Sequence, residues 1–133
     1  MEAISFFHLK IIKDPLQIEY EDSLKKLLSS KWLSITYFDF DNHSGDEIFA
    51  LARQLSEQSD RIILFIDCKM PQADGKVAGW LNFIIRQKAN IILFCRGENA
   101  LIDRMKVAFA HHHEISDYPE LIKIMELKTI NNS

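Results

Sequence analysis

Two stretches of the chain, Ile62 to Ile66 and Ile91 to Phe94, are apolar at every position and begin with the same four residues, Ile-Ile-Leu-Phe. A strand with one face in water alternates apolar and polar residues, whereas a strand covered on both faces is apolar throughout. The two stretches therefore predict central strands of a sheet that carries helices on both faces.

The other apolar residues form strand-like and helix-like segments that alternate along the chain. Further strands are predicted at Ile4 to Ile12, at Leu33 to Phe40 and near Glu114 and Ile115. Helices are predicted from a cap at Asp14 through Pro15 and Tyr20 to about Ser30, from a capping box at Ser44 to Glu47 through Leu55, across Val77 to Ile85, around Leu101 to Phe109, and from Pro119 to Leu127. The second helix is expected to bury Ile48, Leu51, Ala52 and Leu55.

This alternation predicts an α/β fold: a single (βα)₅ domain with a doubly wound parallel sheet, because right-handed crossovers place helices on both faces. For five strands we expect the flavodoxin-like order 2-1-3-4-5, with a crevice at the carboxyl ends of the first and third strands. No linker rich in Pro, Gly or Ser divides the chain. Residues 1–133 are therefore predicted to form one domain, with its core within residues 3–128.

The composition fits a globular domain and excludes several function classes. Of 133 residues, 47% are hydrophobic and 26% are charged, with a formal net charge of −3. No cluster of Lys and Arg suggests a nucleic-acid surface. The first residues lack the pattern of a signal peptide, and no apolar run approaches the length of a membrane span. With only two cysteines, we expect a soluble cytoplasmic protein in a reducing compartment, with no membrane or nucleic-acid partner.

The expected crevice receives the residues at the ends of the first, third and fourth strands. These are Ile12, Lys13 and Asp14, then Asp67, Cys68 and Lys69, then Cys95 and Arg96. The chemistry available there is that of carboxylates, cationic side chains and thiols.

The segment from Asp67 to Gly75 is more specific than the rest of the chain. It has the sequence Asp-Cys-Lys-Met-Pro-Gln-Ala-Asp-Gly and directly follows the third predicted strand. It resembles the phosphoacceptor strand and loop of response-regulator receiver domains, and the matching residues are Asp67, Met70, Pro71, Asp74 and Gly75. Lys13-Asp14-Pro15-Leu16 and Gly45-Asp46-Glu47 resemble two further receiver segments. The resemblance implies the (βα)₅ fold and places Asp67 at the phosphoacceptor position.

The same resemblance implies that most of the phosphorylation chemistry is lost. Receivers hold Mg²⁺ with two adjacent acids after the first strand, and these positions fall on Ile12 and Lys13, which supply no oxygen ligand. Cys95 replaces the expected hydroxyl residue, and the segment from Ile115 to Pro119 lacks the expected lysine. We therefore predict a degenerate pseudo-receiver that is not an enzyme, has no metal or cofactor and is not efficiently phosphorylated. An ion pair between Lys13 and Asp67 would replace the metal.

Simpler interpretations of the crevice residues stay open. Asp67 is as well explained as a carboxylate that caps its loop or pairs with Lys13 or Lys69. Cys68 and Cys95 are expected to be buried thiols, which is the usual environment of a free cysteine.

The other polar residues that suggest a site are explained in the same way. His111, His112 and His113 are expected at the surface or in an interface, because consecutive strand residues point to opposite faces and do not converge on zinc. Asp39 and Asp41 end the second strand, which lies beyond the first strand and too far away to replace the missing acids.

Two functions of different classes follow. The first is a signalling module that binds a protein partner through the fourth helix, fifth strand and fifth helix, using Met105, Phe109, His112, Tyr118 and Ile122. The second is a small-molecule or nucleotide-binding domain, with an anionic ligand near Lys13, Lys69 and Arg96, although no Gly-rich phosphate loop follows any strand. A resemblance to anti-sigma-factor antagonists is weaker, because no serine stands at the required strand-to-helix junction. The identity of the partner and the oligomeric state stay open, a homodimer included.

Overall fold

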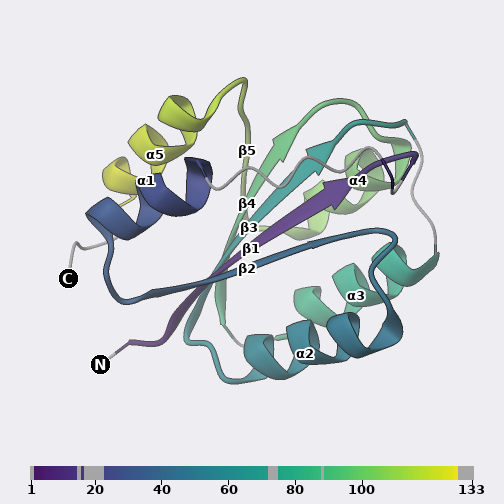
Figure 1. Cartoon of the computed structure of the whole chain (residues 1–133), viewed down its shortest axis with the longest axis horizontal. Helices are drawn as coiled ribbons and strands as arrows, with labels where there is room; N and C mark the ends of the chain where they lie inside the picture. Colours follow the sequence, from purple (N-terminus) through teal and green to yellow (C-terminus); the bar gives the residue numbers. More distant parts are fainter. Residues whose placement is uncertain (1, 15, 17–22, 72–74, 88, 129–133) are drawn as a thin grey trace.

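The computed structural model describes residues 2–14, 16, 23–71, 75–87 and 89–128. Five parallel strands form one sheet in the order β2-β1-β3-β4-β5, which confirms the predicted flavodoxin-like α/β fold (Figure 1). The strands are β1 (Ile4–Ile11), β2 (Ile35–Asp41), β3 (Arg61–Cys68), β4 (Asn90–Arg96) and β5 (His111–Glu114). The helices are α1 (Ser23–Lys31), α2 (Asp46–Glu57), α3 (Gly75–Ile85), α4 (Ala100–Met105), the short 3₁₀ helix η2 (Lys106–Ala108) and α5 (Tyr118–Leu127).

The sheet separates two hydrophobic cores. Helices α1 and α5 lie side by side on one face, and α2, α3 and α4 cover the other (Figure 1). Side chains of each central strand alternate between the two cores, so that Ile63 faces α1 and α5 while Leu64 faces α2 and α3. Ile62 to Ile66 are at most 1% exposed, as expected for a strand covered on both faces.

Helix α2 differs in two ways from the expectation. Its N-cap is Gly45, without a side-chain cap, so the predicted capping box is wrong. The hydroxyl of Ser44 instead accepts a hydrogen bond from the backbone N–H of Asp41 over 3.1 Å. The buried face of α2 is formed by Phe49, Ala52 and Ser56, because the ring of Phe49 packs against Phe40 on β2 and sets the rotation of the helix.

The expected face of α2 is therefore only partly buried. Ile48 is 36% exposed and Leu51 is 51% exposed, whereas Leu55 is half-buried against the core. Ala52 is the one member of the predicted set that is fully buried.

The first and last parts of the chain refine the predicted boundaries. The described part of α1 begins at Ser23, so the predictions for Pro15 and Tyr20 lie outside the described residues. Strand β5 ends at Glu114, earlier than expected, and Ile115 follows it as a buried residue. The side chain of Asp117 caps α5 by accepting from the N–H of Glu120 over 2.9 Å. No helix in the described ranges is long and apolar enough to cross a membrane.

Candidate functional site

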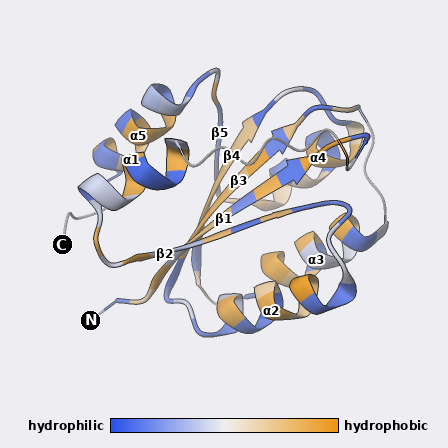
Figure 2. Ribbon diagram, viewed as in Figure 1, coloured by the Kyte–Doolittle hydropathy of each residue, from blue (hydrophilic) through white to orange (hydrophobic). Residues whose placement is uncertain are grey.

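Hydrophilic residues interrupt the apolar strands of the sheet toward their carboxyl ends (Figure 2). On the face beneath α1 and α5, the residues change from apolar to charged in this direction. Near the amino ends, Phe6, Ile63 and Ile92 lie side by side in register. At the carboxyl ends, four adjacent strands contribute an in-register set of charged residues, which we name the charged row: Asp41, Lys10, Asp67 and Arg96. Acid and base alternate along it, so that Asp67 lies between two cations.

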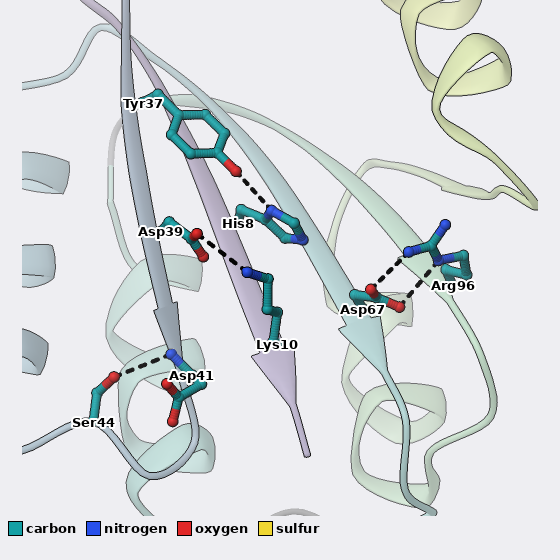
Figure 3. Close-up of polar contacts among 8 residues, drawn as sticks. All are labelled: His8, Lys10, Tyr37, Asp39, Asp41, Ser44, Asp67 and Arg96. Carbon is teal, nitrogen blue, oxygen red and sulfur yellow. Dashed lines mark hydrogen bonds and ion pairs between the residues drawn. The ribbon is translucent and has the colours of Figure 1, made fainter. Parts of the chain in front are cut away.

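Asp67 and Arg96 form a bidentate ion pair (Figure 3). The Nε of Arg96 donates to Oδ1 of Asp67 over 3.0 Å, and Nη2 donates to Oδ2 over 2.7 Å. Asp67 is 3% exposed, whereas the side chain of Arg96 is 28% exposed. The hydrogen bonds to Asp67 raise the pKa of Arg96 above its ordinary value, against the opposing effect of burial. Both carboxylate oxygens of Asp67 are thus engaged by one guanidinium.

Two aromatic rings hold the guanidinium of Arg96 in place. Its carbon lies 5.6 Å from the ring centroid of Phe65 on β3 and 5.0 Å from that of Tyr118 at the start of α5. Contacts of this kind add cation–π attraction to the ion pair. Arg96 therefore connects β3, β4 and the beginning of α5 at a single point.

His8 is the most buried titratable residue of this face, at 1% exposed. Its Nδ1 lies 2.7 Å from the hydroxyl of Tyr37, and its ring stacks on Phe65 with the centroids 4.8 Å apart (Figure 3). Its Nε2 has no hydrogen-bond partner among the described residues. Burial, followed by the charge of Lys10, lowers the pKa of His8 from 6.5 to about 3, so the imidazole is neutral at pH 7.

Lys10 forms a second ion pair on the same face. Its Nζ donates to Oδ2 of Asp39 over 3.1 Å (Figure 3). Because β1 lies between β2 and β3, the strand of Lys10 separates Asp39 and Asp41 from Asp67, as expected from the strand order. Sequence reasoning missed His8 and Lys10. The available signal was their alternation with Phe7 and Leu9 in a strand whose other residues, apart from Ser5, are apolar.

The predicted pairing of Lys13 with Asp67 is wrong. Lys13 and Lys69 are exposed, and the described part of the chain contains no ion pair between either of them and Asp67. Arg96 takes this role because it is the in-register neighbour of Asp67 on β4. Asp14 is half-buried and accepts from the N–H of Leu16 over 2.9 Å, which caps its own loop.

Cys95 belongs to the opposite face of the sheet and does not line the Asp67 site, which corrects the predicted pocket. It pairs in register with Ile66, and alternate residues of a strand point to opposite faces. Cys68 lies on the same face as Cys95, and both residues are buried free cysteines, as expected. Burial is the main cause that raises the pKa of each thiol to about 12.

The loop that follows Asp67 is fastened to the start of α4. The side chain of Asn99 is 2% exposed, donates to the carbonyl of Met70 over 3.1 Å and caps α4. The N–H of Ala100 donates to the carbonyl of Pro71 over 3.1 Å. Gly75 begins α3, and the prediction for Asp74 lies outside the described residues. Asn99 was not predicted, since these contacts are long-range.

Gly97 permits the close approach of β4 to this loop. Its φ is +86°, and an added Cβ would collide with the backbone carbonyl of Cys68. A side chain at this position would therefore be strained by both the backbone conformation and the lack of space.

The five predicted interface residues do not form one surface. Phe109 and Ile122 are each 6% exposed and belong to the two different cores, so the interface prediction is wrong for these two. Met105 is half-buried, Tyr118 packs on Arg96, and His112 is exposed. Helical spacing placed Ile122 correctly on α5, whereas Phe109 lies just after η2 and not on a helix as expected. It did not reveal that both side chains face the cores.

The three histidines form most of β5. His111 and His112 are exposed, and His113 is half-buried with its ring stacked on Phe94 at 5.6 Å. Within the described ranges, no group of three or more His, Cys, Asp or Glu side chains is arranged to hold a metal ion.

A separate cavity of about 630 Å³ opens at the carboxyl ends of β4 and β5, beside α4. Lys106 bridges two acids there, donating to Asp103 over 3.4 Å and to Glu114 over 3.1 Å. The remaining lining residues are Cys95, Gly97, Glu98, Ile115 and Ser116. Three carboxylates and one ammonium give this cavity an excess of negative charge.

Comparisons with known proteins show no relative by sequence. No protein-family model matches the chain, and no curated protein matches it. Among solved structures, a chain of CapF, determined with the inhibitor 3-isopropenyl-tropolone, is similar at a TM-score of 0.48 and 10% sequence identity. The alignment covers 82% of this chain and 29% of the CapF chain, so this chain spans less than a third of CapF.

Proposed function

We propose that this chain is a receiver-like regulatory module that acts through contact with a protein partner and without efficient phosphorylation of Asp67. The observation that carries the proposal is the bidentate ion pair between Asp67 and Arg96, with both oxygens of a 3%-exposed carboxylate engaged. A carboxylate bound in this way is held in place and kept from an incoming phosphoryl donor.

The charges around Asp67 support this proposal. Phosphoryl transfer depends on positioning and on metal ions that neutralise the developing charge. Mg²⁺ is held by oxygen ligands, and its positive charge is repelled by nearby cations. The in-register neighbours of Asp67 are Lys10 and Arg96, both cationic. Arg96 thus already gives Asp67 a positive counter-charge of the kind that a metal ion would supply.

The position of Arg96 supports a regulatory role in which the module keeps one conformation. In a switch, a charge change biases an element that has two arrangements. Here Arg96 joins Asp67 to the ring of Tyr118 at the start of α5 without any modification. The module would therefore present one constitutive surface to its partner.

Acetyl phosphate with Mg²⁺, followed by intact mass measurement, tests the loss of phosphorylation. We expect no phosphoryl adduct on the wild-type chain, while an active receiver in a parallel reaction gains one. A stoichiometric adduct that disappears in Asp67→Ala would overturn the proposal.

The partner part of the proposal has its own test. The wild-type chain and the Arg96→Met variant serve as paired baits, and a partner that reads the constitutive surface should be retained by the wild type and lost by the variant. A purified candidate partner that binds both equally would show that the Arg96 connection does not define the binding surface.

The cavity beside α4 favours a second candidate function, the binding of a small molecule. Its volume of about 630 Å³ lies in the range of ligand pockets. The excess of carboxylates from Glu98, Asp103 and Glu114 favours a cationic ligand over the anionic one expected from the sequence. A thermal-shift screen of amines, nucleotides and flavins distinguishes these, since a bound ligand raises the unfolding midpoint.

A further inference from the structure

A smaller cavity, of about 150 Å³, lies at the amino ends of β3, β4 and β5, at the opposite end of the sheet from Asp67. Its floor is apolar, since Ile92 is 8% exposed and belongs to the core beneath α1 and α5. None of the described residues that line this cavity is an acid. We name its polar and cationic lining residues the basic rim: Arg61, Asn90, His111 and Lys128.

The topology of the sheet brings the basic rim together from separate segments of the chain. Arg61 and Asn90 are in-register neighbours at the starts of β3 and β4. His111 begins β5 and is the in-register neighbour of Ile92. Because alternate residues of a strand share a face, these side chains all lie on the face that α5 covers. Lys128 directly follows α5 and completes the rim from above.

The basic rim holds hydrogen-bond donors that the described part of the chain does not use. The side chains of Asn90 and His111 make no hydrogen bond with another described residue. Arg61 pairs through Nε with the carboxylate of Glu2 over 3.5 Å, and the other N–H groups of its guanidinium remain as donors. A guanidinium, an amide and an imidazole can donate to different oxygens of one anion.

The size of the cavity restricts the anion. A volume of about 150 Å³ equals that of about five molecules of liquid water, at about 30 Å³ each. A phosphate group has five heavy atoms and fits this space, whereas pockets for drug-sized ligands measure about 300–1,000 Å³. Donors that approach from several sides also suit the tetrahedral oxygens of phosphate better than the two coplanar oxygens of a carboxylate.

We propose that the basic rim binds a compact tetrahedral oxyanion, either free phosphate or the phosphate group of a small monoester. Arg61 and Lys128 supply the positive charge, and Asn90 and His111 donate to the remaining oxygens. The site is separate from the Asp67 ion pair and from the cavity beside α4, because both of these lie at the carboxyl ends of the strands.

Titration of the ¹⁵N-labelled chain with inorganic phosphate, followed by nuclear magnetic resonance at constant ionic strength, tests the proposal. We expect saturable shifts of the backbone N–H signals around the basic rim. Arg61→Gln should raise the dissociation constant roughly tenfold or more, because charge-assisted hydrogen bonds are lost. Arg104→Gln is the matched control, since it removes the same charge from an exposed position on α4, on the other face of the sheet. It should leave the dissociation constant unchanged.

Two histidine variants form a second matched pair. His111 and His112 are adjacent and exposed, but they point to opposite faces of β5. His111→Ala should weaken phosphate binding, whereas His112→Ala should not. The spectrum of each variant also shows that it is folded.

Methyl phosphate and acetate distinguish the source and the shape of the anion. Binding of methyl phosphate as tight as that of inorganic phosphate assigns the site to a monoester, and weaker binding assigns it to free phosphate. Acetate should bind more weakly than inorganic phosphate. Shifts that do not saturate, equal effects of Arg61→Gln and Arg104→Gln, or equal effects of the two histidine variants would overturn the proposal.

Discussion

The two faces of the sheet are built from alternate residues of the same strands, yet they differ in chemistry. On the face covered by α2, α3 and α4, β3 stays apolar to its end, from Ile62 through Leu64 and Ile66 to Cys68. On the face covered by α1 and α5, the same strand passes from Ile63 and Phe65 to Asp67. One face is a continuous core, and the other is a core that ends in the charged row.

This difference indicates which face carries function. A buried ion pair contributes little net stability compared with apolar residues of similar volume, because each charge loses its hydration. Stability alone therefore does not explain the charged row, and we interpret the polar end of the α1 and α5 face as the functional part of the sheet. The apolar face then serves as its rigid support.

The largest effect is expected on the apolar face, from Trp80→Ala. Trp80 is 0% exposed and contacts the rings of Phe7 and Phe40 at 5.4 and 5.0 Å. Its removal should lower the free energy of unfolding by about 4 kcal/mol, through lost burial and a residual cavity. Chemical denaturation at pH 7 measures this change.

Trp80→Phe is the control for that substitution. The indole Nε1 of Trp80 has no hydrogen-bond partner among the described residues, so loss of the N–H costs little. We expect a loss of about 2 kcal/mol, well below that of Trp80→Ala, because a smaller ring still fills most of the site. A loss as large as that of Trp80→Ala would show that the polar atom of this face matters.

The second effect is the dependence of stability on pH through His8 on the polar face. The pKa of His8 is about 3 when folded and 6.5 when unfolded, so the unfolded state binds more protons between these values. The contribution of neutral His8 to the free energy of unfolding is therefore complete above pH 6.5 and is lost as the pH falls below that value. At pH 4 the free energy of unfolding should have dropped by about 3 kcal/mol from this group, at about 1.4 kcal/mol per pH unit.

His8→Phe isolates this contribution from that of the carboxylates. The variant keeps a ring that can stack on Phe65 but has no titratable group, so its stability should fall less steeply between pH 6.5 and pH 4. Urea denaturation at several pH values gives the slope of the free energy of unfolding against pH for the wild type and for the variant. Equal slopes for wild type and variant would mean that His8 does not titrate on unfolding in this range.

The sequence predicts the fold better than the site, and particular residues explain why. The apolar runs of β3 and β4 are local, and they suffice for a sheet covered on both faces. The pairing of Asp67 with Arg96 depends on the register between two strands far apart in sequence. The sequence placed Arg96 in the crevice. Without that register, Arg96 could not be preferred to Lys13 as the partner of Asp67.

The same reasoning applies to the rotation of α2. Apolar residues at Ile48 and Phe49 give two overlapping helical faces, and helical spacing does not decide between them. The decision is made by the ring contact of Phe49 with Phe40, which is a tertiary contact. His8 and Lys10 were detectable in principle, because polar residues that alternate within a buried strand mark one face.

The third prediction concerns the two halves of the charged pair. Arg96→Met keeps an apolar stem but leaves the carboxylate of Asp67, whose side chain is 5% exposed, without a counter-charge. The loss should be about 2 kcal/mol, below the value of about 3–5 kcal/mol for fully buried pairs, because Arg96 is partly solvated. Asp67→Asn should cost less, since it leaves an arginine that reaches water. Equal losses would contradict this difference in burial.

The smallest effect is expected for the ion pair between Lys31 and Glu126, which joins α1 to α5 on the outside of the same face. Its atoms are 2.8 Å apart, but the side chains are 42% and 48% exposed. A double-mutant cycle with alanine should give a coupling below about 0.5 kcal/mol that decreases with added salt, because water and ions screen the charges. The same cycle on Arg96 and Asp67 should give a larger, less salt-sensitive coupling. If the two couplings were equal, burial would not be what distinguishes the charged row, and the contrast between the two faces would lose its functional meaning.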